Sequence, residues 1–183
     1  MKNIFTAVIL GIALAGISLA QTSSKASHRT GGSDAPRMAV VEFTTGPNAS
    51  VMDRYAKRDL QAFIASRIHQ SRKFKVVDVR NTREASKSNL AALNGAGTAA
   101  AVKLGKQLDV SYVLTGTVVE YDNKSGQVTL KARLVEVATG KVRYSGESTG
   151  QSSTPIRSGG NAEMMSKAVR PAILDLTARL TGA

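Results

Sequence analysis

Two short glycine-containing segments have the residue types and spacing of known functional motifs. Residues 95–100 (GAGTAA) fit the loose G-x-G-x-x-[GA] pattern of a phosphate-binding turn. In dinucleotide folds that turn follows a strand directly, so that the amino end of the next helix faces the phosphates. Here residues 88–94 are not strand-like, and the preceding strand is expected to end near Val79. The pattern therefore favours a flexible entry to a helix capped by Thr98 over a nucleotide site.

The second segment, residues 146–150 (GESTG), matches the G-x-S-x-G nucleophile elbow and would make Ser148 a nucleophile. The elbow requires a helix after the serine, whereas residues 151–160 are predicted to be a polar loop. Both histidines, His28 and His69, precede Ser148, although the histidine comes last in those hydrolases. A hydrolase that uses Ser148 is kept as the second alternative function, from a different class.

Other catalytic or metal-binding chemistry has little support. The chain has no cysteine, which excludes disulfides and thiolate ligands, and two histidines cannot form a metal cluster unaided. Glu42, Glu120 and Glu136 lie on predicted strands, with no spacing that pairs two of them as acid and base. His69 is expected near a helix C-terminus, as a partner of the helix dipole. We therefore expect no catalytic residue, no cofactor and no metal.

The elements that position these residues begin with a strand, a helix and a strand. Residues 38–43 and 74–79 are short apolar runs typical of buried strands, and residues 44–48 are predicted to be a turn. Ser50 is the predicted N-cap of the intervening helix. Apolar residues recur along this helix at intervals of three and four: Ala56, Leu60, Phe63, Ile64 and Ile68. The pattern predicts a parallel βαβ unit with a right-handed crossover.

Helices over residues 81–94 and 98–108 are expected next. Three strands on tight turns then form an antiparallel meander, at residues 110–121, 128–137 and 142–149, and the second alternates between apolar and polar residues, as a strand with one wet face does. A closing amphipathic helix carries Pro171, which should kink or restart it. The predicted fold class is α/β: a single mixed sheet, with a parallel βαβ start and an antiparallel three-strand meander, flanked by helices.

The amino-terminal region predicts export. Residues 1–20 have a short positive start, a small apolar run and small residues before Gln21, which is typical of a cleaved signal peptide. Residues 21–37 are rich in Ser, Thr, Gly and Lys and are predicted to be a flexible leader, with one domain over 38–183. No cysteine follows the signal to accept a lipid. We therefore expect a periplasmic protein that is not lipidated and has no transmembrane span.

The charge predicts an anionic partner. The net charge is +12, and loss of residues 1–20, whose one charged residue is Lys2, leaves +11. The predicted partner-binding basic face comprises Arg54, Lys57, Arg58, Arg67, Arg72 and Lys73. Nucleic acid is not expected, because aromatic residues are scarce and an exported protein seldom meets it. The alternative is a basic solvated surface with no specific partner.

Three segments carry a resemblance to a known family. Thr44-Thr45-Gly46, residues 104–118 (LGKQLDVSYVLTGTV) and residues 130–142 (LKARLVEVATGKV) resemble the CsgG-type periplasmic domain family. That group includes the curli secretion channel and the LpoB-type activators of penicillin-binding proteins. The resemblance covers residues 38–180.

The resemblance implies a mixed sheet flanked by helices and a non-enzymatic role in the envelope. It implies an accessory protein that binds an envelope protein, such as a penicillin-binding protein or secretion machinery, and that can form homo-oligomers. The first alternative is a curli-assembly or secretion component. However, the places of the channel's membrane hairpins, residues 122–126 and 151–160, are too short to cross a bilayer. Residues 45–50 also lack the aromatic residues of the channel's constriction loop.

Overall fold

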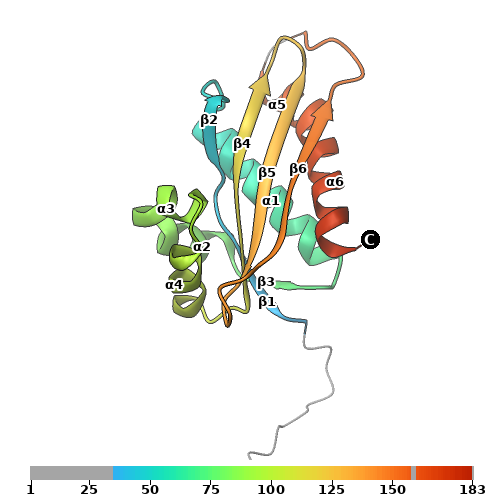
Figure 1. Cartoon of the computed structure of the whole chain (residues 1–183). Coiled ribbons are helices and arrows are strands. Elements are labelled where there is room, and N and C mark those ends of the chain that lie inside the picture. The colour runs from blue at the N-terminus through green and yellow to red at the C-terminus, as the bar shows by residue number, and fades with distance from the viewer. Residues whose placement is uncertain (1–34, 158–159, 183) are drawn as a thin grey trace, which may run out of the picture. The chain divides into compact units, whose positions relative to one another are not determined.

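A mixed β-sheet organises the part of the chain that the computed structural model describes, residues 35–157 and 160–182 (Figure 1). Within these residues the sheet has six strands, with the order β3-β1-β4-β5-β6 and with β2 paired to β4. Helices lie on both sides of it, which confirms the predicted fold class. The predicted signal peptide, residues 1–20, and residues 21–34 of the predicted leader lie outside the described residues.

The predicted βαβ unit is present. β1 (Arg37–Val40) pairs in parallel with β3 (Lys75–Val76), and α1 (Arg54–Gln70) connects them. The helix begins three residues later than a Ser50 cap would allow, so that prediction was wrong. Asp53 is the N-cap, and its side chain accepts a hydrogen bond from Ala56 N at 2.7 Å.

Residues 44–48 correct the prediction of a turn. They form β2 (Thr44–Asn48), which pairs in parallel with β4 through Thr44 and Thr117. Gly46 and Pro47 suggested a turn, but the strand lies beside the far end of β4, and β1 covers only the near end. A glycine and a proline are tolerated at such a sheet edge, where few ladder bonds are made.

The three-strand meander is confirmed. β4 (Tyr112–Asp122), β5 (Gln127–Glu136) and β6 (Val142–Gln151) pair antiparallel in sequence order. The turns end at Gly126 and Gly140, whose φ angles of 71° and 68° suit glycine. β6 forms one edge of the sheet. The two longest strand pairings, β4 with β5 and β5 with β6, lie between the centre of the sheet and this edge.

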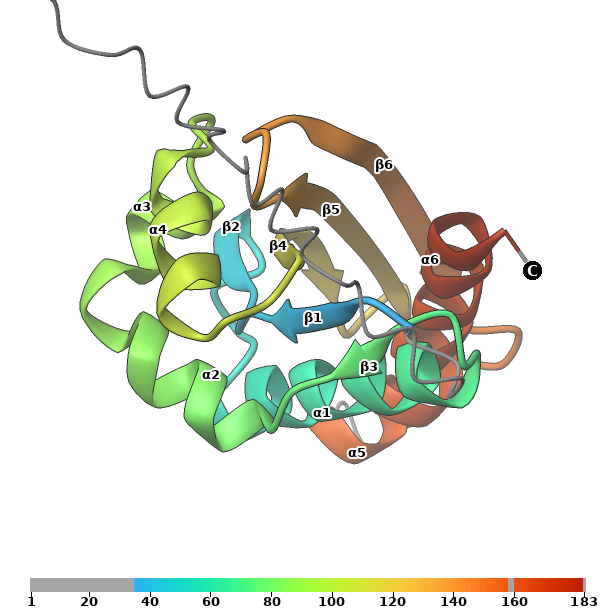
Figure 2. The ribbon, with the colours of Figure 1, turned by 90° about the horizontal axis from the view of Figure 1, so that it is seen from below.

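Three helices pack on one side of the sheet near β1 (Figure 2). They are α2 (Val79–Ser86), α3 (Leu90–Asn94) and α4 (Ala99–Gln107), and a short 3₁₀ turn, Lys87–Asn89, separates α2 from α3. The single helix predicted over 81–94 is thus broken in two. Thr98 is at the N-cap of α4, but its side chain makes no capping hydrogen bond.

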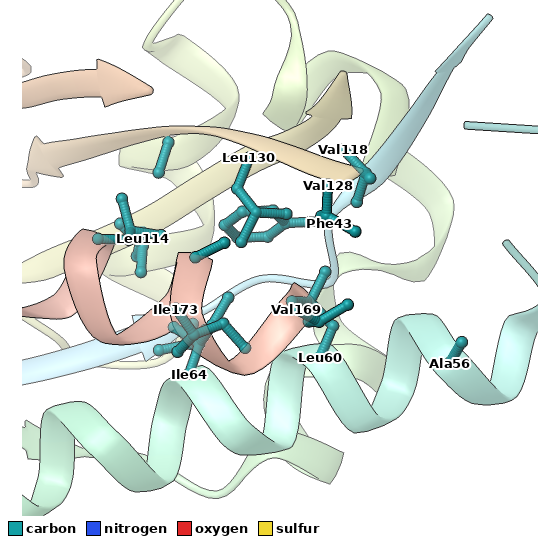
Figure 3. Close-up of a cluster of buried hydrophobic side chains, with 14 of the residues drawn as sticks. Phe43, Ala56, Leu60, Ile64, Leu114, Val118, Val128, Leu130, Val169 and Ile173 are labelled. Atoms are coloured by element: carbon teal, nitrogen blue, oxygen red, sulfur yellow. The ribbon is translucent and has the colours of Figure 1, made fainter. Parts of the chain in front are cut away.

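The other side of the sheet holds the larger core. α1 packs there with α5 (Asn161–Met164), a π-helical turn (Met165–Val169) and α6 (Arg170–Thr181). Pro171 lies in the first turn of α6, directly after the π turn, and the residues at both junctions keep helical dihedrals. The closing helix is therefore interrupted by a π turn next to the proline and does not restart there. Figure 3 shows Leu60 and Ile64 of α1 facing Ile173 of α6 and the side chains of the sheet.

Candidate functional site

Helices cover only half of one face of the sheet, and the candidate site lies on the uncovered half. Val113 and Val135 lie on the covered half, where they pack in a cluster under α3 and α4. Further along the same strands, the side chains on this face are polar and belong to β4, β5 and β6: Thr115, Thr117, Thr129, Lys131, Arg133, Glu147 and Thr149. No helix that the structure describes covers this polar half.

A cavity of about 420 Å³ lies where the helical cover ends. Strands β4 and β5 form its floor, and the segment between α3 and α4 forms its wall. Its lining residues are Asn94, Gly95, Ala96, Thr115, Gly116, Thr117, Lys131 and Arg133. The glycine-rich segment that fits the phosphate pattern therefore does lie at a cavity, so its chemistry is decided by which backbone atoms face the interior.

Asn94 holds this wall to the sheet. Its Oδ1 accepts a hydrogen bond from the Gly116 backbone N–H at 2.6 Å. Its Nδ2 donates to Leu90 O at 3.1 Å and to Glu42 O at 3.3 Å. Gly116 lies between the part of β4 that pairs with β1 and the part that pairs with β2, so the amide side chain serves as a ladder partner at the gap.

Arg133 decides the chemistry of the glycine segment. Its guanidinium donates to the carbonyl oxygens of Gly95 and Ala96, the latter at 2.6 Å. A phosphate-binding turn presents backbone N–H groups to its ligand. Here two carbonyl oxygens are directed at an arginine, so the segment binds a cation of its own chain. This geometry favours the interpretation of residues 95–100 as the entry to a helix over a nucleotide site.

The floor of the cavity combines an unused hydroxyl with cationic side chains. Thr115 is fully buried, and its Oγ1 has no hydrogen-bond partner. Lys131 Nζ lies 3.3 Å from Glu147 Oε1, and both side chains are more than half exposed. Such an exposed ion pair is weak and is screened by salt. Arg133 forms no ion pair with a carboxylate of the described residues.

Ser148 is not placed as a nucleophile. It lies within β6, is only 2% exposed and faces α6. Its Oγ is 2.7 Å from both Ala172 O and Asp175 Oδ2, and its single proton can be donated to only one of them. The hydrogen bond from Ser148 lowers the pKa of Asp175 below its usual value. The G-x-S-x-G pattern is therefore a strand whose serine holds the closing helix.

The six basic residues of the predicted partner-binding face are distributed along α1 and just beyond its C-terminal end, and they do not form one exposed face. Arg54, Arg72 and Lys73 are exposed, whereas Lys57, Arg58 and Arg67 are half-buried. Arg58 and Arg67 are nine residues apart on α1, which places them about 180° apart around the helix. Arg67 Nη1 donates to Gln70 Oε1 at 3.1 Å. The exposed residues thus lie at the two ends of α1.

The other titratable candidates have partners within the fold. Glu42 pairs with Arg83, with 3.4 Å between Oε2 and Nε, and Glu120 Oε2 accepts from Gln127 Nε2 at 2.6 Å. Hydrogen bonding from Arg143 lowers the pKa of Glu136. His69 is exposed in the last turn of α1, as predicted. No group of three or more acidic or histidine side chains within the described ranges could hold a metal ion.

Sequence reasoning missed Asn94, Thr115 and Arg133 as site residues. The polar–apolar alternation of residues 128–137 did place Lys131 and Arg133 on the wet face of a strand. Nothing in the sequence showed that the segment after α3 would lie over that face. The pairing of Asn94 with Gly116, 22 residues later, is a tertiary contact with no local signal.

No family model and no curated protein matches the chain. Solved structures do resemble it. Lipoprotein GNA1162 from Neisseria meningitidis is 23% identical, with 78% of this chain and 96% of that chain covered and a TM-score of 0.53. The PelC dodecamer from Paraburkholderia phytofirmans is 18% identical, with coverages of 80% and 87% and a TM-score of 0.52.

The LpoB C-terminal domain from Salmonella enterica is 21% identical, with 67% of this chain and 87% of that chain covered and a TM-score of 0.46. The link to the curli channel stays a prediction. None of the helices described is both long and apolar enough to cross a membrane. At these identities, the likenesses to GNA1162 and PelC establish a shared α/β fold.

Proposed function

We propose that this chain is a non-enzymatic, exported accessory protein of the cell envelope that acts by binding another protein. The observation that carries the proposal is the polar, uncovered half of the sheet face. The two segments with motif-like spacing are engaged otherwise: Ser148 donates a hydrogen bond to α6, and the carbonyl groups of the glycine segment accept hydrogen bonds from Arg133. A polar sheet face that remains open is suited to binding.

The cellular setting is proposed from several indications. The sequence pattern of residues 1–20 favours export to the periplasm, and the absence of cysteine favours a protein without a lipid anchor. GNA1162 is named a lipoprotein and PelC forms a dodecamer, which supports an envelope role and a homo-oligomer for this chain. The sequence resemblance to LpoB-type activators favours a penicillin-binding protein synthase as the partner that this chain regulates or helps to assemble.

The basic residues are proposed to assist binding to an anionic or acidic envelope component. Retention of the full chain on isolated envelope should fall as salt rises, because exposed charges are screened over about 10 Å at 0.1 M salt. Replacing Arg54, Arg72 and Lys73 with Glu should weaken retention further. A matched control replaces the exposed Lys103 and Lys106 of α4 with Glu. Retention that is independent of salt, or equally weakened by the control, would contradict the electrostatic part.

The protein-binding part is tested by crosslinking the full chain to isolated envelope and identifying the adducts. A reproducible adduct with one envelope protein is expected, and adducts with no envelope protein would reject the function. The alternative, a curli-type secretion component, predicts steady conductance in planar bilayers. We expect none, because the described residues that link β4 to β5 (123–126) and that follow β6 (152–157) contain no strand.

A further inference from the structure

We propose that the cavity beside Asn94 is a receptor for a single carboxylate, presented by an acidic residue of the partner protein. The inference rests on the proposed protein-binding function and names the chemical group that the partner contributes. The cavity's size is at the lower end of the range of ligand pockets, which is about 300–1,000 Å³. A carboxylate with its adjoining methylene groups would occupy only part of that volume.

The charge around the cavity favours an anion. Arg133 and Lys131 both line it, and Glu147 is the acidic side chain paired there, with Lys131. Arg133 donates only to neutral carbonyl oxygens, so its positive charge is not compensated by a carboxylate within the described ranges. A guanidinium has five N–H donors, so donors remain for a ligand after two carbonyl groups are bound.

The unpartnered hydroxyl supplies a second, independent indication. Thr115 Oγ1 is buried at the floor of the cavity without a hydrogen-bond partner. Burying a hydroxyl without a partner is unfavourable, and such groups in native proteins are rare. Once the side chains that cover this hydroxyl move slightly aside, a carboxylate oxygen above the floor would accept from it and lie near the two cations. The arrangement therefore offers one neutral and two charged donors from β4 and β5.

A carboxylate fits these groups better than a phosphate does. The two cations and Glu147 leave one excess positive charge, which matches a monoanion. The carbonyl oxygens of Gly95 and Ala96 face the guanidinium at the wall, where a phosphate-binding turn would offer N–H groups. Additional negative charge would be repelled by those oxygens. The wall itself is held in place by Asn94 before a ligand binds.

The test uses the full chain, labelled with ¹⁵N, and matched short peptides. The probe is Gly-Glu-Gly with both ends blocked, and the comparison peptide replaces Glu with Gln. We expect the Glu peptide to shift saturably the amide signals of Gly95, Gly97 and Gly116, and the Gln peptide to shift them little. Acetate and inorganic phosphate are titrated in parallel.

Two pairs of variants locate the binding. Thr115→Val keeps the shape of the side chain and removes the hydroxyl, and should weaken Glu-peptide binding at least about tenfold, as expected for loss of a charge-assisted hydrogen bond. Thr149→Val, on the same sheet face, is its control. Arg133→Gln should weaken binding by a similar factor, whereas Arg143→Gln, which removes an arginine from β6, should not. Melting curves verify that each variant is folded.

Several outcomes overturn the inference: equal shifts from the Gln peptide, unchanged binding in Thr115→Val, or tighter binding of phosphate than of the Glu peptide. If acetate binds as tightly as the Glu peptide, the natural ligand is a small organic acid and not an acidic residue of a partner protein. Envelope crosslinking then separates the two proposals. If the peptide binds but no envelope protein crosslinks, the carboxylate site stands and the proposed function fails. If adducts form and excess Glu peptide neither binds nor competes, the proposed function stands and this inference fails.

Discussion

The two faces of the sheet are built differently from the same strands. On one face, α1 and α6 cover the ladder, and the side chains between them are apolar and buried, including Leu114, Leu130 and Ile173 (Figure 3). On the other face, α3 and α4 cover only the half near β1, and threonines, lysine and arginine occupy the remainder. Successive side chains of a strand point to opposite faces of the sheet, so the same strands can present an apolar face to the helices and a polar face to solvent.

The difference separates what stabilises the fold from what is available for recognition. Burial of apolar side chains between the sheet and the helices supplies most of the stability. The exposed polar pairs, such as Lys131 with Glu147, contribute little to it. Changes on the helix-covered face should therefore affect folding, and changes on the polar half should affect binding while leaving folding nearly intact.

The largest effect is expected from a charge on the covered face. Ile173 is fully buried, so Ile173→Asp would bury an unpaired carboxylate. The expected cost is several kcal/mol, which is a large share of the roughly 5–15 kcal/mol of a typical domain. Thermal melting followed by circular dichroism measures it. Leu174→Asp is the control on the same helix, because Leu174 is 43% exposed. Equal melting temperatures for the two variants would mean that α6 is not part of the core.

A smaller loss is expected where the backbone of β6 approaches α6. A Cβ at Gly150 would lie 2.0 Å from Ala168 O, so strand and helix must move apart in Gly150→Ala. Overpacking of this kind costs about 1–3 kcal/mol. Gly97→Ala is the matched change on the other face, where nothing lies within 4 Å of the added carbon. Urea unfolding should show a lower midpoint for Gly150→Ala alone, and a normal midpoint there would contradict the close approach.

The sequence predicted the covered face well. Apolar residues at intervals of three and four identified the buried side of α1, and Leu60, Ile64 and Ile68 are indeed fully buried. The turn residues and the alternation of residues 128–137 identified the meander. These signals are local, because they depend on the period of a helix or a strand and not on distant contacts. An irregularity next to Pro171 is predicted for the same reason, since a proline cannot donate to the helix ladder, and the structure has a π turn there.

The errors of prediction lie where a distant partner decides the structure. Residues 44–48 carry turn residues, yet they extend because β4 offers free ladder groups beyond the end of β1. The cap of α1 was placed at Ser50, but the chain turns until Asp53. The candidate site was missed for a related reason. Arg133 and the segment at Gly95 are 38 residues apart, and only the folded sheet brings them together.

The buried contact of Ser148 should appear in the pH dependence of stability. The hydrogen bond from Ser148 lowers the pKa of Asp175 in the folded protein, and Arg179 adds to this effect. The resulting stabilisation is complete above the ordinary aspartate pKa and is lost as the pH falls through the lower folded value. Ser148→Ala should cost about 1 kcal/mol at neutral pH and reduce the loss of stability below about pH 4.

Urea unfolding at a series of pH values measures both effects of Ser148→Ala. Ser145→Ala, an exposed serine on the same strand, is the control and should leave the pH dependence as in the wild type. If Ser148→Ala retains the full acid-dependent loss, its hydroxyl donates to Ala172 O and not to Asp175. That result would assign the lowered pKa of Asp175 to Arg179 instead.

The smallest expected effect is a gain in stability on the polar half of the sheet. Thr115→Val removes a buried hydroxyl that has no partner, so the melting temperature should rise by about 2–4 °C, for a gain of up to about 1 kcal/mol. Thr82→Val removes a hydroxyl that donates to Asp78 O at 3.1 Å, and should instead lower the melting temperature. Both threonines are fully buried, so burial of the side chain is the same in the two variants. Changes in melting temperature of opposite sign would therefore report the effect of the hydrogen bond alone. A loss for Thr115→Val as large as that for Thr82→Val would show that the hydroxyl has a partner in the free protein, and would make Thr115 a structural residue like those of the covered face.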